Sequence, residues 1–393
     1  MSEILINRDL NTEIMRLKQY FPVIVITGPR QSGKTTLCRN LFSGYRAIDM
    51  MRAADRQIVE ANPEAFLKKY ADGLLIDEAQ YYPEIFEYLR IAADELPQSN
   101  FIVTGSNNLS LMEKVTESLA GRAAMLVLLP LSLHELGEKA QTPTLTLLLK
   151  GGYPAVWAKD IPADDAMRQY YNLYVERDVR RLINVKNMSK FQIFMKLCAG
   201  RIGSEFNANN LSIEIGVSIP TIQEWLSVLE ASYVVFRLHP FYRNIGKRLI
   251  KTPKLYFYDT ALACFLLGIE NESHLETHPL RGMLFENYVV LELLKNRYNA
   301  GKDNNLLFYR DKSQREIDIV QDFGATCRAF EIKSATAFRS DFLNNLKYLK
   351  SLLGEALVST QVIYDGNSNT DIQENGIVNF RNIEYENHRS DSV

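Results

Sequence analysis

Residues 28–35 read GPRQSGKT and match the pattern G-x-x-x-x-G-K-[ST] in full. In such a loop the glycines let backbone amides turn inward onto phosphates, and the helix that follows adds partial positive charge. Lys34 is then expected to contact the β- and γ-phosphates of a nucleoside triphosphate, and the Thr35 hydroxyl to bind Mg²⁺. The residues predicted to bind the triphosphate are Gly28, Pro29, Arg30, Gln31, Ser32, Gly33, Lys34, Thr35 and Thr36.

Two acidic residues, Asp77 and Glu78, follow the apolar run 74–76. A strand that ends in two acids places carboxylates at the carboxyl edge of a sheet, where α/β proteins bind ligands. Asp77 is predicted to hold Mg²⁺ through water, and Glu78 to orient the attacking water. The alternative is a solvated strand end, and the phosphate loop upstream favours the functional interpretation.

Ser106 and Arg122 are weaker candidates for the same site. Ser106 lies near the end of the strand-like run 101–107, with Thr104 and Asn107 as neighbours, and is predicted to sense the γ-phosphate, although strand ends are often polar for turn reasons alone. Arg122 precedes the next strand and is the first candidate for an arginine finger, a cation that stabilises the transferring phosphoryl group. Arg122 could equally be an ordinary surface arginine. The alternative finger candidates are Arg177, Arg180 and Arg181.

A second group of chemical residues lies near the carboxyl end, in REIDIV (315–320) and AFEIKS (329–334). Residues two apart on a strand share a face, so pairing these strands can bring Asp318 beside Glu331 and Lys333. Two carboxylates there are predicted to bind Mg²⁺, with Glu286 as a third ligand and Lys333 as a catalytic cation. The alternative is a fold of this type that binds and does not cut.

The elements that would position the loop are apolar strands at 23–27, 73–78, 101–107 and 123–132, with helical stretches between them. Continuous apolar strands alternating with helices predict a parallel sheet covered on both faces. Residues 131–190 are predicted to be mostly helical. Residues 191–243 read as helix, short helix, helix and then a strand pair.

That order is the one found in winged-helix domains. In its third helix, Thr221, Gln223 and Glu224 are predicted to be exposed, whereas helices that read DNA usually carry more cations. The cations come after the predicted strand pair, where they could contact phosphates or simply be solvated. They are Arg243, Lys247, Arg248, Lys251 and Lys254.

Composition limits the function classes further. The net charge is −2, so any nucleic-acid site must be a local basic patch. The four cysteines form no C-x-x-C pair, and no apolar run approaches the length of a spanning helix. A cytoplasmic protein with no membrane partner is therefore predicted.

The motifs in combination resemble the bacterial and archaeal AAA+ ATPases that carry a C-terminal module. The resemblance rests on GPRQSGKTTL, LLIDEAQ, FIVTGSN, SLAGR and LPLSLHEL, and downstream on GGYPAV, YVERDVRRLINV and FYRDKSQREIDIV…FEIKS. It implies an α/β fold with a parallel P-loop sheet, and ATP and Mg²⁺ as cofactors. Because the finger arginine of AAA+ proteins acts across a subunit interface, a homo-oligomer is a hypothesis.

The same resemblance implies four segments, and the polar composition of the last residues predicts a fifth. They are an ATPase core at 1–131, a helical lid at 132–190, a winged-helix segment at 191–245, a PD-(D/E)-x-K nuclease-like domain at 246–370 and a polar tail at 371–393. Two functions remain open at this point. One is an ATP-driven enzyme that acts on DNA, and the other is a nucleotide-gated switch that contacts a protein partner and cuts nothing.

Overall fold

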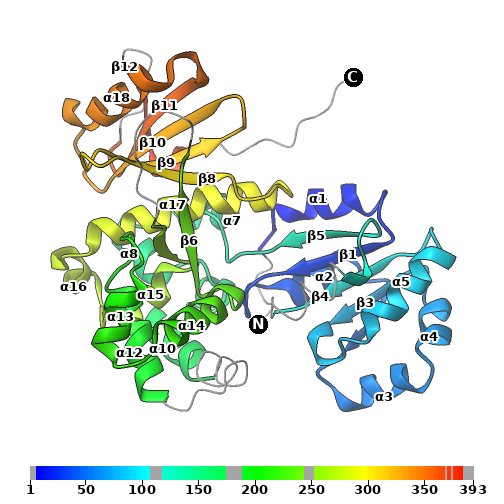
Figure 1. The fold of residues 1–393 in the computed structure, drawn as a ribbon. Helices are drawn as coiled ribbons and strands as arrows, with labels where there is room; N and C mark the ends of the chain where they lie inside the picture. Colours follow the sequence, from blue (N-terminus) through cyan, green and yellow to red (C-terminus); the bar gives the residue numbers. More distant parts are fainter. Residues whose placement is uncertain are drawn as a thin grey trace.

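The computed structural model describes residues 6–106, 117–173, 188–242, 252–367, 370–372 and 375–383. The chain forms the predicted nucleotide-binding unit, called the nucleotide unit below, which is built on one sheet. A group of helices lies beside it, and a second sheet lies above those helices (Figure 1). No helix among the residues just named is long and apolar enough to cross a membrane.

The first sheet has five parallel strands in the order β2-β3-β4-β1-β5. The strands are β1 (Val23–Thr27), β2 (Arg46–Asp49), β3 (Leu74–Asp77), β4 (Phe101–Thr104) and β5 (Ala123–Val127). All four predicted strands are present, although β5 ends before the predicted residue 132. The prediction missed β2, an edge strand whose sequence RAID carries two charged residues and no apolar run.

Helices cover both faces of this sheet. They are α1 (Leu10–Leu17), α2 (Lys34–Leu41), α3 (Ala53–Ala61), α4 (Pro63–Lys69) and α5 (Ile85–Glu95). Val23 and Val25 of β1 pack in one hydrophobic cluster with residues of α3, α4 and α5. Ile24 and Ile26 pack in another cluster with residues of α1 and α2. Successive residues of one strand thus enter opposite layers, which confirms the predicted covered parallel sheet.

A helical region follows the nucleotide unit. Its helices are α7 (Leu133–Leu136), α8 (Thr144–Lys150), α9 (Pro154–Ala158), α10 (Ala163–Tyr170), α12 (Met188–Ala199), α13 (Ala208–Ile215), α14 (Ile219–Ala231), α15 (Thr260–Leu266), α16 (Glu272–Thr277) and α17 (Arg281–Asn299). One hydrophobic cluster, from Leu129 to Ile383, includes side chains from all of the segments after the core. The predicted lid, winged-helix and nuclease-like segments therefore share one core.

The second sheet is mixed and has eight strands in the order β12-β13-β11-β10-β9-β8-β6-β7. The strands are β6 (Val235–Pro240), β7 (Lys254–Phe257), β8 (Leu306–Arg310), β9 (Glu316–Asp322), β10 (Cys327–Lys333), β11 (Leu357–Tyr364), β12 (Thr370–Ile372) and β13 (Asn375–Asn379). Helix α18 (Asn344–Leu353) packs against it. The predicted strands at 315–320 and 329–334 are confirmed as the antiparallel pair β9 and β10.

Two predictions in this region are wrong. The strand pair expected from Tyr233 to the end of residues 191–243 is, in its described part, a single strand, β6, which pairs antiparallel with β7 and parallel with β8. Pro240 lacks an amide donor and is the last residue of β6. A boundary at residue 245 would separate the paired strands β6 and β7.

The polar tail expected at 371–393 is also partly structured. Strand β13 pairs parallel with β11, and Phe380 and Ile383 lie in the main core. Because most residues of this stretch are polar, its composition did not indicate that a few apolar side chains, among them Phe380 and Ile383, are buried in the core. Residues 384–393 lie outside the described part of the chain.

Candidate functional site

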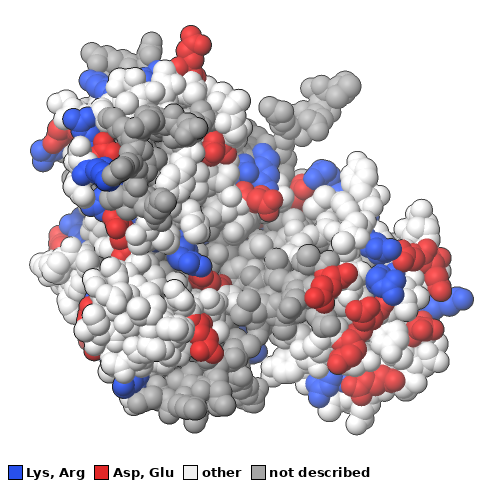
Figure 2. Space-filling view, viewed as in Figure 1, with Lys and Arg blue, Asp and Glu red and all other residues white. Residues whose placement is uncertain are grey.

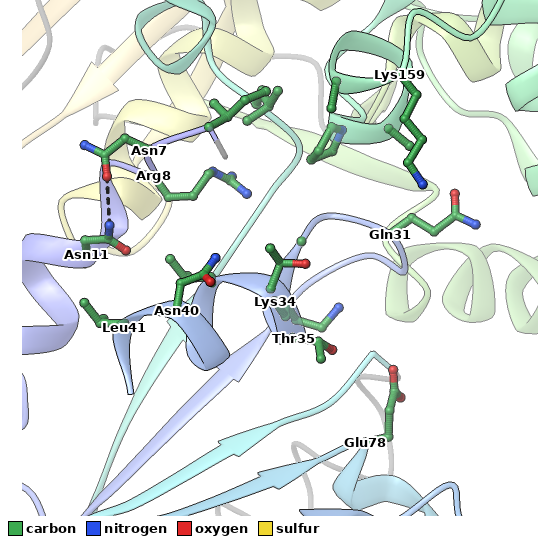
Figure 3. A pocket seen from close by; sticks show the side chains of 18 residues that line it. Asn7, Arg8, Asn11, Gln31, Lys34, Thr35, Asn40, Leu41, Glu78 and Lys159 are labelled. Carbon is green, nitrogen blue, oxygen red and sulfur yellow. Dashed lines mark hydrogen bonds between the residues drawn. The ribbon is translucent and has the colours of Figure 1, made fainter. Parts of the chain in front are cut away.

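The phosphate loop lies between β1 and α2, at the carboxyl edge of the first sheet (Figure 3). Gly28 has a φ of 142°, and a Cβ there would lie 2.2 Å from the carbonyl oxygen of Leu128. Gly33 has a φ of 95° and is followed at once by the first residue of α2. Both glycines are therefore required by the backbone, as the pattern predicted.

Lys34 is the buried cation of the loop. Its ammonium donates to the carbonyl oxygens of Gly28, at 2.9 Å, and Pro29, at 2.7 Å. Burial lowers the Lys34 pKa to about 8, and the nearby Glu78 and Asp77 only partly oppose this shift. A buried ammonium held only by neutral oxygens is poised to gain an anionic partner, and phosphate oxygens would supply one.

Thr35 and Asp77 meet beside the loop. The Thr35 hydroxyl donates to Asp77 Oδ1 at 3.0 Å, and the Thr104 hydroxyl donates to the same oxygen. Burial raises the Asp77 pKa, and the two hydroxyl hydrogen bonds oppose this rise. One hydroxyl and one carboxylate next to a phosphate site are ligands that Mg²⁺ accepts, so the donors fit the ion.

Glu78 is held by two neighbours at the end of β3. The Ser106 hydroxyl donates to Glu78 Oε2 at 3.0 Å. The Gln80 amide donates to the same oxygen and, at 3.1 Å, to Ser106 Oγ. The φ of Glu78 is 52°, a left-handed conformation that is uncommon outside glycine and is often found at functional sites. Sequence reasoning missed Gln80, although it lies only two residues beyond Glu78.

A cavity of about 480 Å³ opens over the loop. From the predicted loop residues, Gln31, Gly33, Lys34, Thr35 and Thr36 line it. The remaining walls come from the amino-terminal segment, from α2, from Glu78, and from α9 with Lys159 behind it (Figure 3). The volume lies in the range of small-molecule sites.

The other predicted loop residues support the loop from behind. Arg30 donates to the Tyr81 hydroxyl at 3.3 Å, and Ser32 is buried. The Ser32 carbonyl accepts from the buried guanidinium of Arg8 at 2.7 Å. Arg8 also donates to Glu135 at 2.9 Å and to the Leu129 carbonyl at 2.6 Å. Arg8 thus ties the loop to the chain that leaves the sheet, and no sequence signal singled it out.

Arg122 lies away from this cavity. It directly precedes β5, whereas the loop follows β1, and the two strands are parallel neighbours. Arg122 is therefore at the opposite edge of the sheet, where it donates to Asp94 at 2.5 Å. It cannot reach the phosphate loop of its own chain. The alternatives Arg177, Arg180 and Arg181 lie outside the described residues, as does Asn107 beside Ser106.

The carboxyl-terminal acids do come together. Ile319 pairs with Phe330 in the β9–β10 register, so Asp318 lies opposite Glu331. Lys333 binds Glu331 at 2.7 Å and Asp318 at 3.5 Å. Burial, together with the adjacent Asp318, raises the Glu331 pKa. The predicted neighbourhood of these three side chains is therefore confirmed.

Glu286, the predicted third ligand, has other partners. Its Oε1 accepts from the Tyr256 hydroxyl at 2.5 Å and from the Lys254 ammonium at 3.2 Å. Across residues 6–106 and the other described ranges, no three or more His, Cys, Asp or Glu side chains form a group that could hold a metal ion. Asp318, Glu331 and Glu286 in this arrangement do not fit a magnesium ion bound by all three.

The predicted nucleic-acid surface has few exposed cations in the part that the structure describes. Gln223, Glu224 and Ser227 are the exposed residues in the middle of α14, and none is a cation. Of the predicted basic run, Arg243, Lys247, Arg248 and Lys251 lie outside the described residues, and Lys254 is buried. On the described surface seen in Figure 2, acidic side chains gather over the nucleotide unit, and Lys and Arg are scattered.

Comparisons with known proteins match three segments of the chain. Residues 20–137 match the model of an AAA domain, and residues 141–273 and 281–383 match two domains of unknown function, DUF8612 and DUF4143. Uncharacterized proteins of Mycobacterium tuberculosis and Mycobacterium bovis are each 30% identical over 337 residues, which cover 83% of this chain and 73% of theirs.

A more distant relative and one solved structure extend the comparison. An uncharacterized protein of Haemophilus influenzae is 25% identical over 409 residues, covering 93% of this chain and 97% of its own. The Walker-type ATPase PABY2304 of Pyrococcus abyssi aligns with a TM-score of 0.47 and 15% identity, over 67% of this chain and 96% of that one.

Proposed function

The chain belongs to the same family as the two mycobacterial proteins and carries an AAA domain at residues 20–137, and we propose that it binds ATP with Mg²⁺ at the phosphate loop and hydrolyses it. The observation that supports this most strongly is the convergence of Lys34, Thr35, Asp77 and Glu78 at one cavity edge. Lys34 and Thr35 come from the first turn of α2, and Asp77 and Glu78 from the end of β3. Each has the chemical type that its role requires.

The roles follow from the contacts. Lys34 exchanges its two backbone carbonyl partners for β- and γ-phosphate oxygens. Thr35 and Asp77 hold Mg²⁺, which neutralises charge on the triphosphate. Glu78 orients and polarises the attacking water once its hydrogen bonds to Ser106 and Gln80 loosen. Ser106 donates a hydrogen bond to Glu78, so a γ-phosphate that displaces this bond would be sensed by Ser106.

A pair of substitutions tests this proposal. Lys34→Ala should abolish ATP binding because it removes the ammonium inside the loop. Glu78→Gln should leave the ATP dissociation constant nearly unchanged and lower kcat by at least about 10²-fold, the usual contribution of a general base. Lys68→Ala, an exposed lysine of α4, is the matched control and should behave as wild type. Undiminished ATP affinity in Lys34→Ala, or normal turnover in Glu78→Gln, would overturn these roles.

The partner of the ATPase is a separate proposal, with two candidates. The first is DNA, supported by the winged-helix order of α12, α13, α14, β6 and β7 and by the basic run after β6. The second is a nucleotide-gated switch that contacts a protein, with a nuclease-like domain that does not cut. The lack of cations among the exposed residues in the middle of α14 and the lysine contacts of Glu286 and Glu331 favour the second.

An ATPase assay with and without duplex and single-stranded DNA separates the two candidates. The DNA proposal expects faster turnover with DNA and an affinity that falls steeply as salt rises. The switch proposal expects neither effect. Lys34→Ala serves as the blank that subtracts contaminating ATPase activity.

A further inference from the structure

One wall of the nucleotide cavity comes from α9, outside the phosphate loop. The residues that form it, called the α9 wall below, are Pro154, Ala155, Ala158 and Lys159, and Lys159 points into the cavity (Figure 3). Pro154 packs on the loop itself, because a Cβ added to Gly33 would lie 3.7 Å from Pro154 Cγ. Helix α9 has only five residues, so neighbouring segments must hold it in place.

The turn before α9 is held by Asp259. The Gly152 amide donates to Asp259 Oδ2 at 2.8 Å. Gly151 has a φ of 60°, and a Cβ there would lie 2.2 Å from Asp259 Oδ1. On its other side the turn is tied to the chain that leaves the first sheet, because the Gly152 carbonyl accepts from the Leu131 amide at 2.7 Å. Since α9 begins at Pro154, the position of this turn decides where the α9 wall begins.

Asp259 is itself fixed in the interior. It is 3% exposed and is the N-cap of α15, where its Oδ1 accepts from the Ala261 amide at 2.9 Å. Burial raises the Asp259 pKa, and the hydrogen bond from Gly152 is the largest of the contributions that oppose this rise. The two carboxylate oxygens therefore serve two different elements, α15 and the turn before α9.

We propose that Asp259 is a positioning residue of the nucleotide site, which holds the α9 wall against the phosphate loop through the Gly151–Gly152 turn and thereby increases nucleotide affinity. Asp259 does not line the cavity, so it acts through Gly152. The inference rests on the proposed ATPase function and deepens it. The AAA domain match ends at residue 137, whereas Asp259 and the α9 wall lie in the match at 141–273. The nucleotide site is thus completed by residues outside the AAA domain.

The expected effect is on binding more than on chemistry. A wall that is already in place adds its contacts without an ordering cost, whereas a loose wall must be ordered when the nucleotide binds. Asp259→Asn keeps the size of the side chain, but the amide has one acceptor oxygen, so it can serve only one of the two elements. Asp259→Ser keeps a residue type that caps helices well and lacks the second oxygen, so the Gly152 amide loses its acceptor.

The test compares full-length wild type with Asp259→Asn, Asp259→Ser and a matched control, Asp311→Asn. Asp311 is also 3% exposed, and it accepts from the Arg315 amide at 3.1 Å and from the Tyr348 hydroxyl at 3.2 Å, in the second sheet rather than beside the cavity. Both positions thus lose a buried carboxylate that accepts from a backbone amide.

Three quantities are measured. Both Asp259 variants should raise the ATP dissociation constant, obtained by isothermal titration calorimetry, at least about tenfold, while kcat at saturating ATP falls by a smaller factor. Hydrogen–deuterium exchange of residues 151–159 in the nucleotide-free protein should be at least about fivefold faster than in wild type. Asp311→Asn should keep the wild-type dissociation constant and the wild-type exchange at 151–159.

Folded Asp259 variants with wild-type ATP affinity, or with wild-type exchange at residues 151–159, would overturn the proposal. So would an equal loss of affinity in Asp311→Asn, because any buried acid would then have the same effect. If the Asp259 variants do not fold, Gly152→Ala displaces the same turn from its other side, since its Cβ would lie 2.7 Å from the Leu131 carbonyl oxygen, and it must weaken ATP binding too. Wild type that binds no ATP contradicts the proposed function, whereas unchanged variants of an ATP-binding wild type contradict this inference alone.

Discussion

Among single residues, Gly28 has the tightest steric constraint in the phosphate loop. Its φ is 142°, and an added Cβ would lie 2.2 Å from the carbonyl oxygen of Leu128 in the neighbouring chain segment. Gly28→Ala should therefore lower the free energy of unfolding by about 1–3 kcal/mol, because the loop must shift or distort. Urea unfolding followed by circular dichroism measures this change.

Gly44→Ala is the control for that substitution. A Cβ on Gly44 would meet no atom within 4 Å. Alanine there should be neutral or raise the free energy of unfolding by up to about 1 kcal/mol, since it restricts the unfolded chain. Equal losses in Gly28→Ala and Gly44→Ala would show that steric crowding at Leu128 is not the cause.

Lys34 makes ATP binding depend on pH. Burial lowers its pKa to about 8, so the ammonium of the free protein loses its proton as the pH rises above that value. Bound phosphates favour the charged form, so binding above pH 8 must take up a proton. The ATP dissociation constant should be flat near pH 7 and then rise by up to about tenfold per pH unit above pH 8.

Isothermal titration calorimetry in two buffers of different ionisation enthalpy checks this expectation, because it counts the protons taken up. The uptake should approach one proton per ATP above pH 8 and be close to zero at pH 7. An ATP affinity that stays constant up to pH 9.5 would contradict a lowered Lys34 pKa.

At the scale of elements, α17 braces the chain that leaves the first sheet. Lys295 donates to the Leu131 carbonyl and to Glu292, each at 2.8 Å, and Glu292 accepts from the Leu133 amide at 2.7 Å. Both side chains are buried. Lys295→Met would leave the Glu292 carboxylate without its cation, and should lower the free energy of unfolding by about 3–5 kcal/mol.

Two further variants show whether charge is the cause. Adding Glu292→Gln to Lys295→Met removes the unpaired charge and should recover part of the loss. Lys347→Met, on the exposed side of α18, should change stability by less than about 0.5 kcal/mol. If the double variant is less stable than Lys295→Met, the brace depends on the hydrogen bond to Leu133 more than on charge.

An element could be predicted from sequence when its own residues determine it, and not when residues distant in sequence do. The interior strands β1, β3 and β4 carry continuous apolar runs, so they could be predicted from sequence, and the phosphate loop has its own pattern. Strands β2 and β13 could not, because pairing with neighbours stabilises them more than their own residues do.

The same distinction holds within the two sites. Asp77 and Glu78 follow their strand directly, and the alternation of β9 and β10 placed Asp318 beside Glu331. Arg8 and Lys254 could not be placed in advance, because their partners lie on segments distant in sequence. Lys254 was assigned to a phosphate-contacting run by composition, whereas tertiary packing buries it among acids.

In the whole molecule, the turn after α14 contacts the end of the strand that leads into the phosphate loop. The Tyr233 hydroxyl lies 2.9 Å from Thr27 Oγ1, and Thr27 is the residue before the phosphate loop. Tyr233 follows α14 and has a φ of 55°, so a left-handed turn presents its ring to β1. A rearrangement of the loop on ATP binding would therefore act on α14 and β6, which is the coupling that either partner proposal requires.

Arg122 connects this chain to a second copy of itself, if the finger prediction holds. It lies across the sheet from its own phosphate loop, so it can only act on the loop of a neighbouring subunit. Arg122→Ala should keep ATP binding and lower kcat by about 10³–10⁵-fold, as measured for other arginine fingers. Light scattering at assay concentrations should show an oligomer, and wild-type turnover should rise faster than linearly with protein concentration.

Mixing two inactive variants gives the decisive measurement. Arg122→Ala subunits keep an intact Glu78 site, and Glu78→Gln subunits keep an intact Arg122. In a mixed oligomer, some interfaces pair an intact site with an intact arginine, so turnover should reappear at a fraction set by the mixing ratio. A same-chain role for Arg122 predicts no recovery at any ratio. A strictly monomeric protein with full ATPase activity would exclude the finger at Arg122 and, with it, the need for an oligomer.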